Sequence, residues 1–201
     1  MPSPVEQLRQ ERRRKLQVRE SFIKGLEHFR GQASDPLGFY LACGTYLAIG
    51  QRRLIDQDQR LVDVLAPREP DAQREDHQAI EALRSRLDLA DRSLGEFERA
   101  VEELRRAGTP GRARFEAAAA RFLDVLVNVL GSRSHSLRHL TTTLLNDDDW
   151  TRIAGITPES LAAEKEQFAA VARTAPAGLD PDRMSTEPPA KPSEQVRSHP
   201  A

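Results

Sequence analysis

Four long stretches of this chain carry apolar residues at helical spacing, and short segments rich in glycine and proline separate them. In the second stretch a large apolar residue recurs every seven positions, the spacing of a seam along one face of a bundled helix. The residues of this seam are Tyr40, Leu47, Leu54 and Leu61. A chain with this pattern throughout is expected to be all-α.

Glycine and proline mark where the expected helices begin and end. Gly31 follows the first stretch, Pro36 opens the second, and segment 108–111 is a turn before the fourth. The expected helices cover about residues 4–30, 36–66, 71–107 and 112–144. Because the connections are short, consecutive helices are expected to be antiparallel, which gives an up-down-up-down four-helix bundle.

The expected organisation has three parts. Residues 1–146 form the four-helix bundle, and residues 147–174 form a short helical extension whose last helix is capped by Thr157. The apolar residues expected to fasten this extension to the bundle are Trp150, Ile153, Ile156, Leu161 and Phe168. Residues 175–201 are rich in Pro, Ser and Glu and poor in apolar residues, so this tail is expected to be disordered.

The composition limits the compartment and the partners. The 30 Lys and Arg residues nearly match the 31 Asp and Glu residues, so nucleic acid is not an expected partner. Cys43 is the only cysteine, which excludes an internal disulfide, and the chain begins without the apolar region of a signal peptide. No apolar run is long enough to span a bilayer. These features predict a cytoplasmic protein with no membrane partner.

No catalytic motif is evident in the sequence. It contains neither a glycine-rich phosphate loop nor a serine nucleophile elbow, and Cys43 has no evident base partner. The pattern favours a protein that is not an enzyme, although it does not decide the question. What remains is a set of histidines and carboxylates, which helical bundles use to build metal sites from facing helices.

Five of these side chains are candidate metal ligands, because counting residues from each turn places them at a similar height. They are Glu11, Asp58, His77, His135 and His139. Asp58 has apolar neighbours one turn away in both directions, so its carboxylate is expected inside the bundle, where it needs a partner. Glu11 lies on the apolar face of the first expected helix, and His77 lies at the edge of the apolar face of the third. The last two histidines face away from the core unless a π-bulge or kink shortly before them rotates their turn.

Three segments carry a family resemblance: residues 53–61, residues 74–77, and 135–139 followed by Asp148-Asp149-Trp150. Together they resemble the hemerythrin-like (HHE) cation-binding proteins. The resemblance implies a non-heme metal such as iron, with a role in oxygen or redox sensing or in iron handling. The chain departs from the family at three ligand positions. Leu54 stands where the family has a histidine, Glu81 where it has the second histidine of a His-x-x-x-His pair, and His139 where it has a carboxylate.

Two other interpretations remain open. In the first, the protein is a metal-free helical bundle that serves as an interaction or homodimerisation module without catalytic activity. Asp58 is then a buried carboxylate paired with Arg12 or Arg19, and the histidines are surface residues. In the second, which rests on fold analogy, a pocket between the helices binds a small apolar effector.

Overall fold

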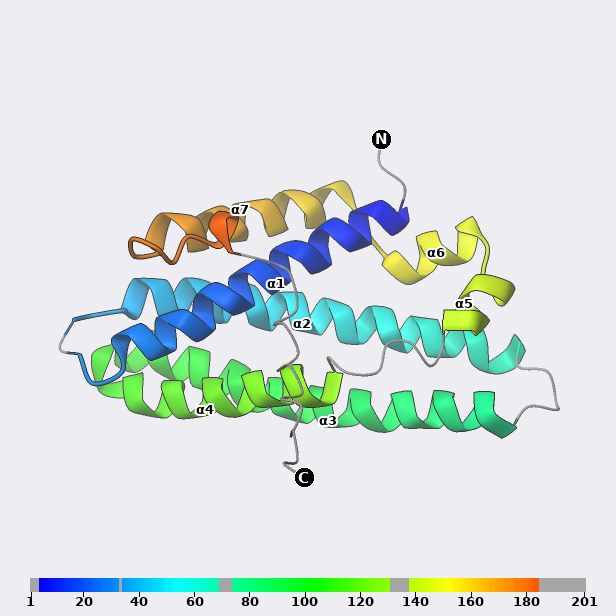
Figure 1. Ribbon diagram of the computed structural model, residues 1–201, viewed down its shortest axis with the longest axis horizontal. Helices are drawn as coiled ribbons and strands as arrows, with labels where there is room; N and C mark the ends of the chain where they lie inside the picture. The colour runs from blue at the N-terminus through cyan, green and yellow to red at the C-terminus, as the bar shows by residue number, and fades with distance from the viewer. Residues whose placement is uncertain (1–3, 33, 69–73, 131–137, 185–201) are drawn as a thin grey trace, which may run out of the picture.

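The computed structural model describes residues 4–32, 34–68, 74–130 and 138–184, and within these residues the protein is all-helical, without strands (Figure 1). The all-α prediction is therefore confirmed for this part of the chain. The α-helices are α1 (Pro4–Phe29), α2 (Leu37–Leu65), α3 (Arg74–Ala107), α4 (Arg112–Val125), α5 (Arg138–Leu144), α6 (Asp147–Ala154) and α7 (Pro158–Thr174).

Helix α2 holds the central position. It packs against α1, α3 and α7, while α4 packs on α3. Figure 1 shows α1, α2, α3 and α4 running in alternating directions along the long axis of the molecule, with α7 lying beside α1 and α2. The short helix α6 contacts both α1 and α2.

The core is built around aromatic rings contributed by α1, α2, α3 and α4. The rings of Phe97 and Phe122 stack with centroids 4.3 Å apart, and the hydroxyl of Tyr40 donates to Glu116 at 2.9 Å. Buried tyrosines normally satisfy their hydroxyl in this way. Gly25 lets α1 approach α2 closely, since a Cβ at this position would overlap the ring of Phe39. The helical periodicity of the apolar residues thus translates directly into one shared core.

The fourth expected helix is not a single α-helix. Helix α4 ends at Val125, the π-helical turn Leu126–Leu130 follows, and α5 begins at Arg138; residues 131–137 lie outside the described residues. Val125 precedes the turn, Val127 and Val129 lie within it, and Gly131 follows it. Valine and glycine are poor helix formers, so the helix propensity of the sequence is low here. The expectation of one continuous helix to about residue 144 was wrong.

The last helix of the extension begins where the sequence predicted. Thr157 caps α7, accepting from the backbone N–H of Ser160 in a reciprocal capping box, as expected. Ile153 and Phe168 are buried against the rest of the protein, whereas Trp150 is only partly buried.

The segment after α7 is packed, which corrects the expected start of the disordered tail at Ala175. Leu179 and Met184 are buried, and the hydroxyl of Ser21 on α1 donates to the carbonyl of Leu179. Residues 175–184 therefore belong to the folded part, because two apolar side chains find a surface on α1. Residues 185–201 lie outside the described residues.

Within the described residues, none of the helices combines the length and apolarity needed to cross a membrane.

Candidate functional site

The two carboxylates predicted as metal ligands face neighbouring helices but are engaged by arginines. Glu11 is 4% exposed, and its two carboxylate oxygens each lie 3.2 Å from a guanidinium nitrogen of Arg53 on α2. Asp58 is half-buried and lies 3.7 Å from Arg12 on α1. Arg12 was one of the two partners expected for Asp58 in the metal-free interpretation.

Of the three predicted histidine ligands, only His77 has a described side chain, and it is exposed on α3. His135 lies outside the described residues, as does the side chain of His139, whose backbone belongs to α5. Across the part of the chain that the structure describes, no group of three or more His, Cys, Asp or Glu side chains is arranged to hold a metal ion. The described candidates thus do not fit a metal site, and the contribution of the other two histidines stays a prediction.

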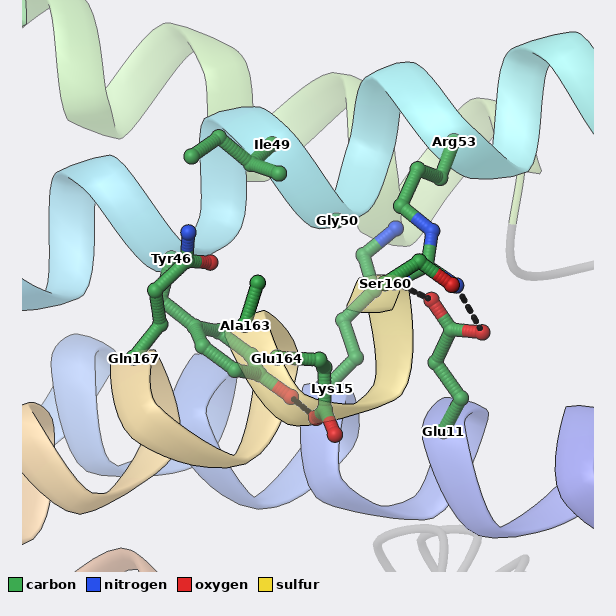
Figure 2. Close-up of a pocket in the computed structure, with 10 residues that line it drawn as sticks. All are labelled: Glu11, Lys15, Tyr46, Ile49, Gly50, Arg53, Ser160, Ala163, Glu164 and Gln167. Atoms are coloured by element: carbon green, nitrogen blue, oxygen red, sulfur yellow. Dashed lines mark hydrogen bonds and ion pairs between the residues drawn. The ribbon is translucent and has the colours of Figure 1, made fainter. Parts of the chain in front are cut away.

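A cavity of about 170 Å³ that opens to solvent lies between α1, α2 and α7 (Figure 2). Its polar lining comes from Glu11, Lys15, Tyr46, Arg53, Glu164 and Gln167. The small and apolar part of the lining comes from Ile49, Gly50, Ser160 and Ala163.

Glu164 anchors the α7 side of this cavity. Its side chain is 6% exposed and forms a two-point ion pair with Arg14 on α1, with contacts of 2.8 and 2.6 Å. The hydroxyl of Tyr46 on α2 donates to Glu164 Oε1 at 2.5 Å, as Figure 2 shows. Burial and this hydrogen bond to a carboxylate raise the pKa of Tyr46, so its hydroxyl stays protonated as a donor. One carboxylate therefore joins three helices.

Glu11 lies at the opposite end of the cavity, toward Arg53 (Figure 2). Burial raises the pKa of Glu11, and the nearby Arg53 opposes that rise. Its Oε2 accepts a hydrogen bond from Arg53, whereas its Oε1 accepts none of good geometry among the described residues, so that second contact with Arg53 is electrostatic. A buried acid of this kind depends on its arginine partner.

Lys15 differs from the other charged residues of the cavity, because no carboxylate lies within ion-pairing distance of it among the described residues. It is 9% exposed and donates to the side-chain oxygen of Gln51. Its stem passes over Gly50, where a Cβ would lie 3.8 Å from Lys15 Cδ. Burial lowers the pKa of Lys15 to about 7, and the charge of Asp58 only partly opposes this effect.

Sequence reasoning found Glu11, Asp58 and Arg12 but missed Lys15 and Glu164. A signal for Glu164 existed, because Leu161 and Phe168 flank it at helical spacing and place it on the apolar stripe of the last helix. Lys15 follows Glu11 by four residues and occupies the same buried face. Each of these charged residues shares a helix face with apolar residues. The sequence interpretation applied this criterion to Glu11, Asp58 and Arg12 but not to Lys15 or Glu164.

Comparisons with known protein families, with curated proteins and with solved structures find no match to this chain. The fold and site define an all-α protein with a buried cluster of charges between three helices.

Proposed function

We propose that this protein is a metal-free helical bundle that acts as a homodimerisation module and has no catalytic activity. In this proposal α1–α4 form the up-down-up-down antiparallel bundle expected from the sequence, and α7 covers the α1–α2 side. A cytoplasmic location and the lack of a nucleic-acid partner remain predictions from composition.

The engagement of both predicted acid ligands by arginines supports the metal-free part. A cation at Glu11 and Asp58 would have to displace Arg53 and Arg12, leaving two guanidinium groups beside the metal. Breaking the largely buried Glu11–Arg53 pair would cost about 3 to 5 kcal/mol, whereas the Asp58–Arg12 pair, in which Arg12 is half-exposed, adds little to that cost.

The expected heptad seam does not provide the dimer surface, since Tyr40 and Leu47 are fully buried within the chain. The observation that carries the dimer proposal is instead a surface groove of about 490 Å³ between α3 and α4. Its floor consists of small residues, Ala100, Ala117 and Ala118, which allow a second helix to approach closely.

The two walls of this groove carry opposite net charge. The α3 wall presents Glu96, Arg99 and Glu103, and the α4 wall presents Arg114 and Arg121. Arg114 pairs with Glu103 across the groove at 2.6 Å, so Glu96 and Arg121 are the charges of opposite sign that remain for a second copy. In a two-fold symmetric pair the same surface meets itself, so Glu96 of one copy can face Arg121 of the other. This complementarity favours a second copy of the chain as the occupant.

Charge reversal tests the proposal. Light scattering on the full chain is expected to give twice the 22.5 kDa mass of one chain. The variant Arg121→Glu is expected to be monomeric, because the new carboxylate would face Glu96 of the other copy. Adding Glu96→Arg to that variant exchanges the two charges and is expected to restore the dimer. A monomeric wild type, or a dimer that survives Arg121→Glu, contradicts the proposal.

The second candidate function is the hemerythrin-like one, with a non-heme metal such as iron. One observation favours it: the π-helical turn Leu126–Leu130 ends five residues before His135. Such turns are frequent at functional sites and rotate the residues that follow them. Loss of bound metal in the double variant His135→Ala, His139→Ala would support this candidate, whereas protein that contains no metal in the wild type would remove it.

A further inference from the structure

Three ion pairs lie in or beside the cavity between α1, α2 and α7, and Lys15 belongs to none of them. Glu11 pairs with Arg53, Glu164 with Arg14, and Asp58 with Arg12. Lys15 remains, and in its charged form it has three N–H donors. Among the described residues only Gln51 accepts from it, so two donors are left for another acceptor. An anion is the partner that this arrangement lacks.

The apolar part of the cavity lining favours an anion that carries a hydrocarbon group. Figure 2 shows the Lys15 side chain crossing from α1 to α2, with its amine beside Gly50. The side chains of Ile49 and Ala163 line the same cavity, and Ile49 is 41% exposed. A ligand with a hydrocarbon part would cover this apolar surface, whereas inorganic phosphate would leave it in contact with water.

The size of the cavity limits the ligand. Its volume of about 170 Å³ is close to that of the roughly 150 Å³ engineered cavity that accommodates benzene, a molecule of six non-hydrogen atoms. A carboxylate with a chain of about four carbons has the same number of non-hydrogen atoms. Because Ile49 is 41% exposed, the cavity opens to solvent, and the end of a longer fatty acid would extend into water without gaining contacts.

We propose that this cavity binds a short-chain carboxylate, with the carboxylate group on the Lys15 amine and the hydrocarbon part against Ile49 and Ala163. The site would be shared by α1, α2 and α7, so that the ligand adds a contact between α7 and the rest of the protein. This inference does not depend on dimerisation, because none of these residues lies in the α3–α4 groove.

Isothermal titration of the full chain with four probes tests the proposal. Butyrate is expected to bind at one site per chain, and acetate at least tenfold more weakly because it leaves the apolar surface uncovered. Octanoate is expected to bind no more tightly than butyrate, because the end of its chain would lie in water. Butyramide, the neutral analogue of butyrate, is expected to show no binding because it cannot pair with Lys15. Absence of saturable butyrate binding, or equal binding of butyramide, overturns the proposal.

Variants connect the binding to the cavity. Lys15→Met keeps the length of the side chain, removes the cation, and is expected to weaken butyrate binding at least tenfold. Lys24→Met, on the same helix but half-exposed, is the matched control and is expected to leave binding unchanged. Ala163→Leu is expected to abolish butyrate binding by filling the apolar part. Butyrate binding that survives Lys15→Met, or phosphate binding tighter than butyrate, contradicts the assigned ligand class.

Discussion

Arg14 and Glu164 lie 150 positions apart in the sequence, yet they meet through two contacts, Nε–Oε1 at 2.8 Å and Nη2–Oε2 at 2.6 Å. The first contact is a hydrogen bond and the second an ion pair, and together they fix the orientation of α7 relative to α1. Because Tyr46 donates to the same carboxylate, the pair joins α7 to both α1 and α2. Helix α7 is thus held in place by charge as well as by apolar packing.

The first prediction concerns this ion pair. Glu164→Gln is expected to lower the free energy of unfolding by about 2 to 3 kcal/mol, because it leaves Arg14 without its acid in a largely buried setting. The value lies below that of a fully buried pair since Arg14 keeps some contact with solvent. Urea denaturation at pH 7 measures the change. Glu166→Gln, at an exposed position of the same helix, is the control and is expected to cost less than about 0.5 kcal/mol. Equal stabilities of the two variants would refute the role of the pair.

The second prediction follows from the lowered pKa of Lys15. The folded protein releases this proton at a pH of about 7, whereas the unfolded chain keeps it to 10.5. Between these values the unfolded state binds more protons, so stability rises with pH. We expect a gain of roughly 1.5 kcal/mol between pH 7 and 8.5 at about 1.36 kcal/mol per proton and pH unit. Urea denaturation across this interval measures it.

Lys15→Met is the control for this pH dependence. It removes the titrating group and keeps the stem over Gly50, so the rise between pH 7 and 8.5 is expected to vanish. The interval stops at pH 8.5 because burial raises the pKa of Cys43, which makes stability fall with pH above about 9. A rise that persists in the variant would show that another group causes it.

Asp149 gives the third prediction. Its carboxylate accepts two hydrogen bonds from Arg68, at 2.6 and 2.8 Å, and these bonds lower its pKa to about 2. Its contribution to stability is therefore complete above the unfolded pKa of about 4 and is lost as the pH falls toward 2. Asp149→Asn is expected to destabilise the protein at pH 7, with the difference from wild type shrinking below pH 4. Thermal unfolding at several pH values, with the exposed Asp148→Asn as control, checks this.

The fourth prediction tests the packed segment after α7. Leu179 is 8% exposed against α1, so Leu179→Ala is expected to cost about 2 to 3 kcal/mol of unfolding free energy. Leu89→Ala, at a position 37% exposed on α3, removes the same atoms and is expected to cost less than about 1 kcal/mol. Similar costs for both variants, measured by urea denaturation, would mean that residues 175–184 do not add to the folded core.

Features that depend on nearby residues could be predicted from the sequence. The helices arise from apolar periodicity, and the cap of α7 needs only Thr157 and Ser160, three positions apart. The inward phase of Glu11 and Asp58 was also predicted, because each can be compared with residues one turn away.

Features that depend on distant residues could not be predicted in the same way. The partner of Glu164 lies on α1, and no local pattern links it to Arg14. The π-helical turn Leu126–Leu130 depends on packing as well as on weak helix propensity. The sequence indicated only that a bulge or kink could occur shortly before His135. The packing of Leu179 was missed because a single apolar residue in a polar segment gives no periodic signal.

The most direct test of the account is the metal content of the full chain, purified without a histidine tag. Elemental analysis, followed by titration with Fe(II) under anaerobic conditions, measures both resident and added metal. Because arginines engage Glu11 and Asp58, we predict only trace metal in every preparation and no saturable uptake of iron. One metal ion per chain that is lost in Asp58→Asn would contradict the account.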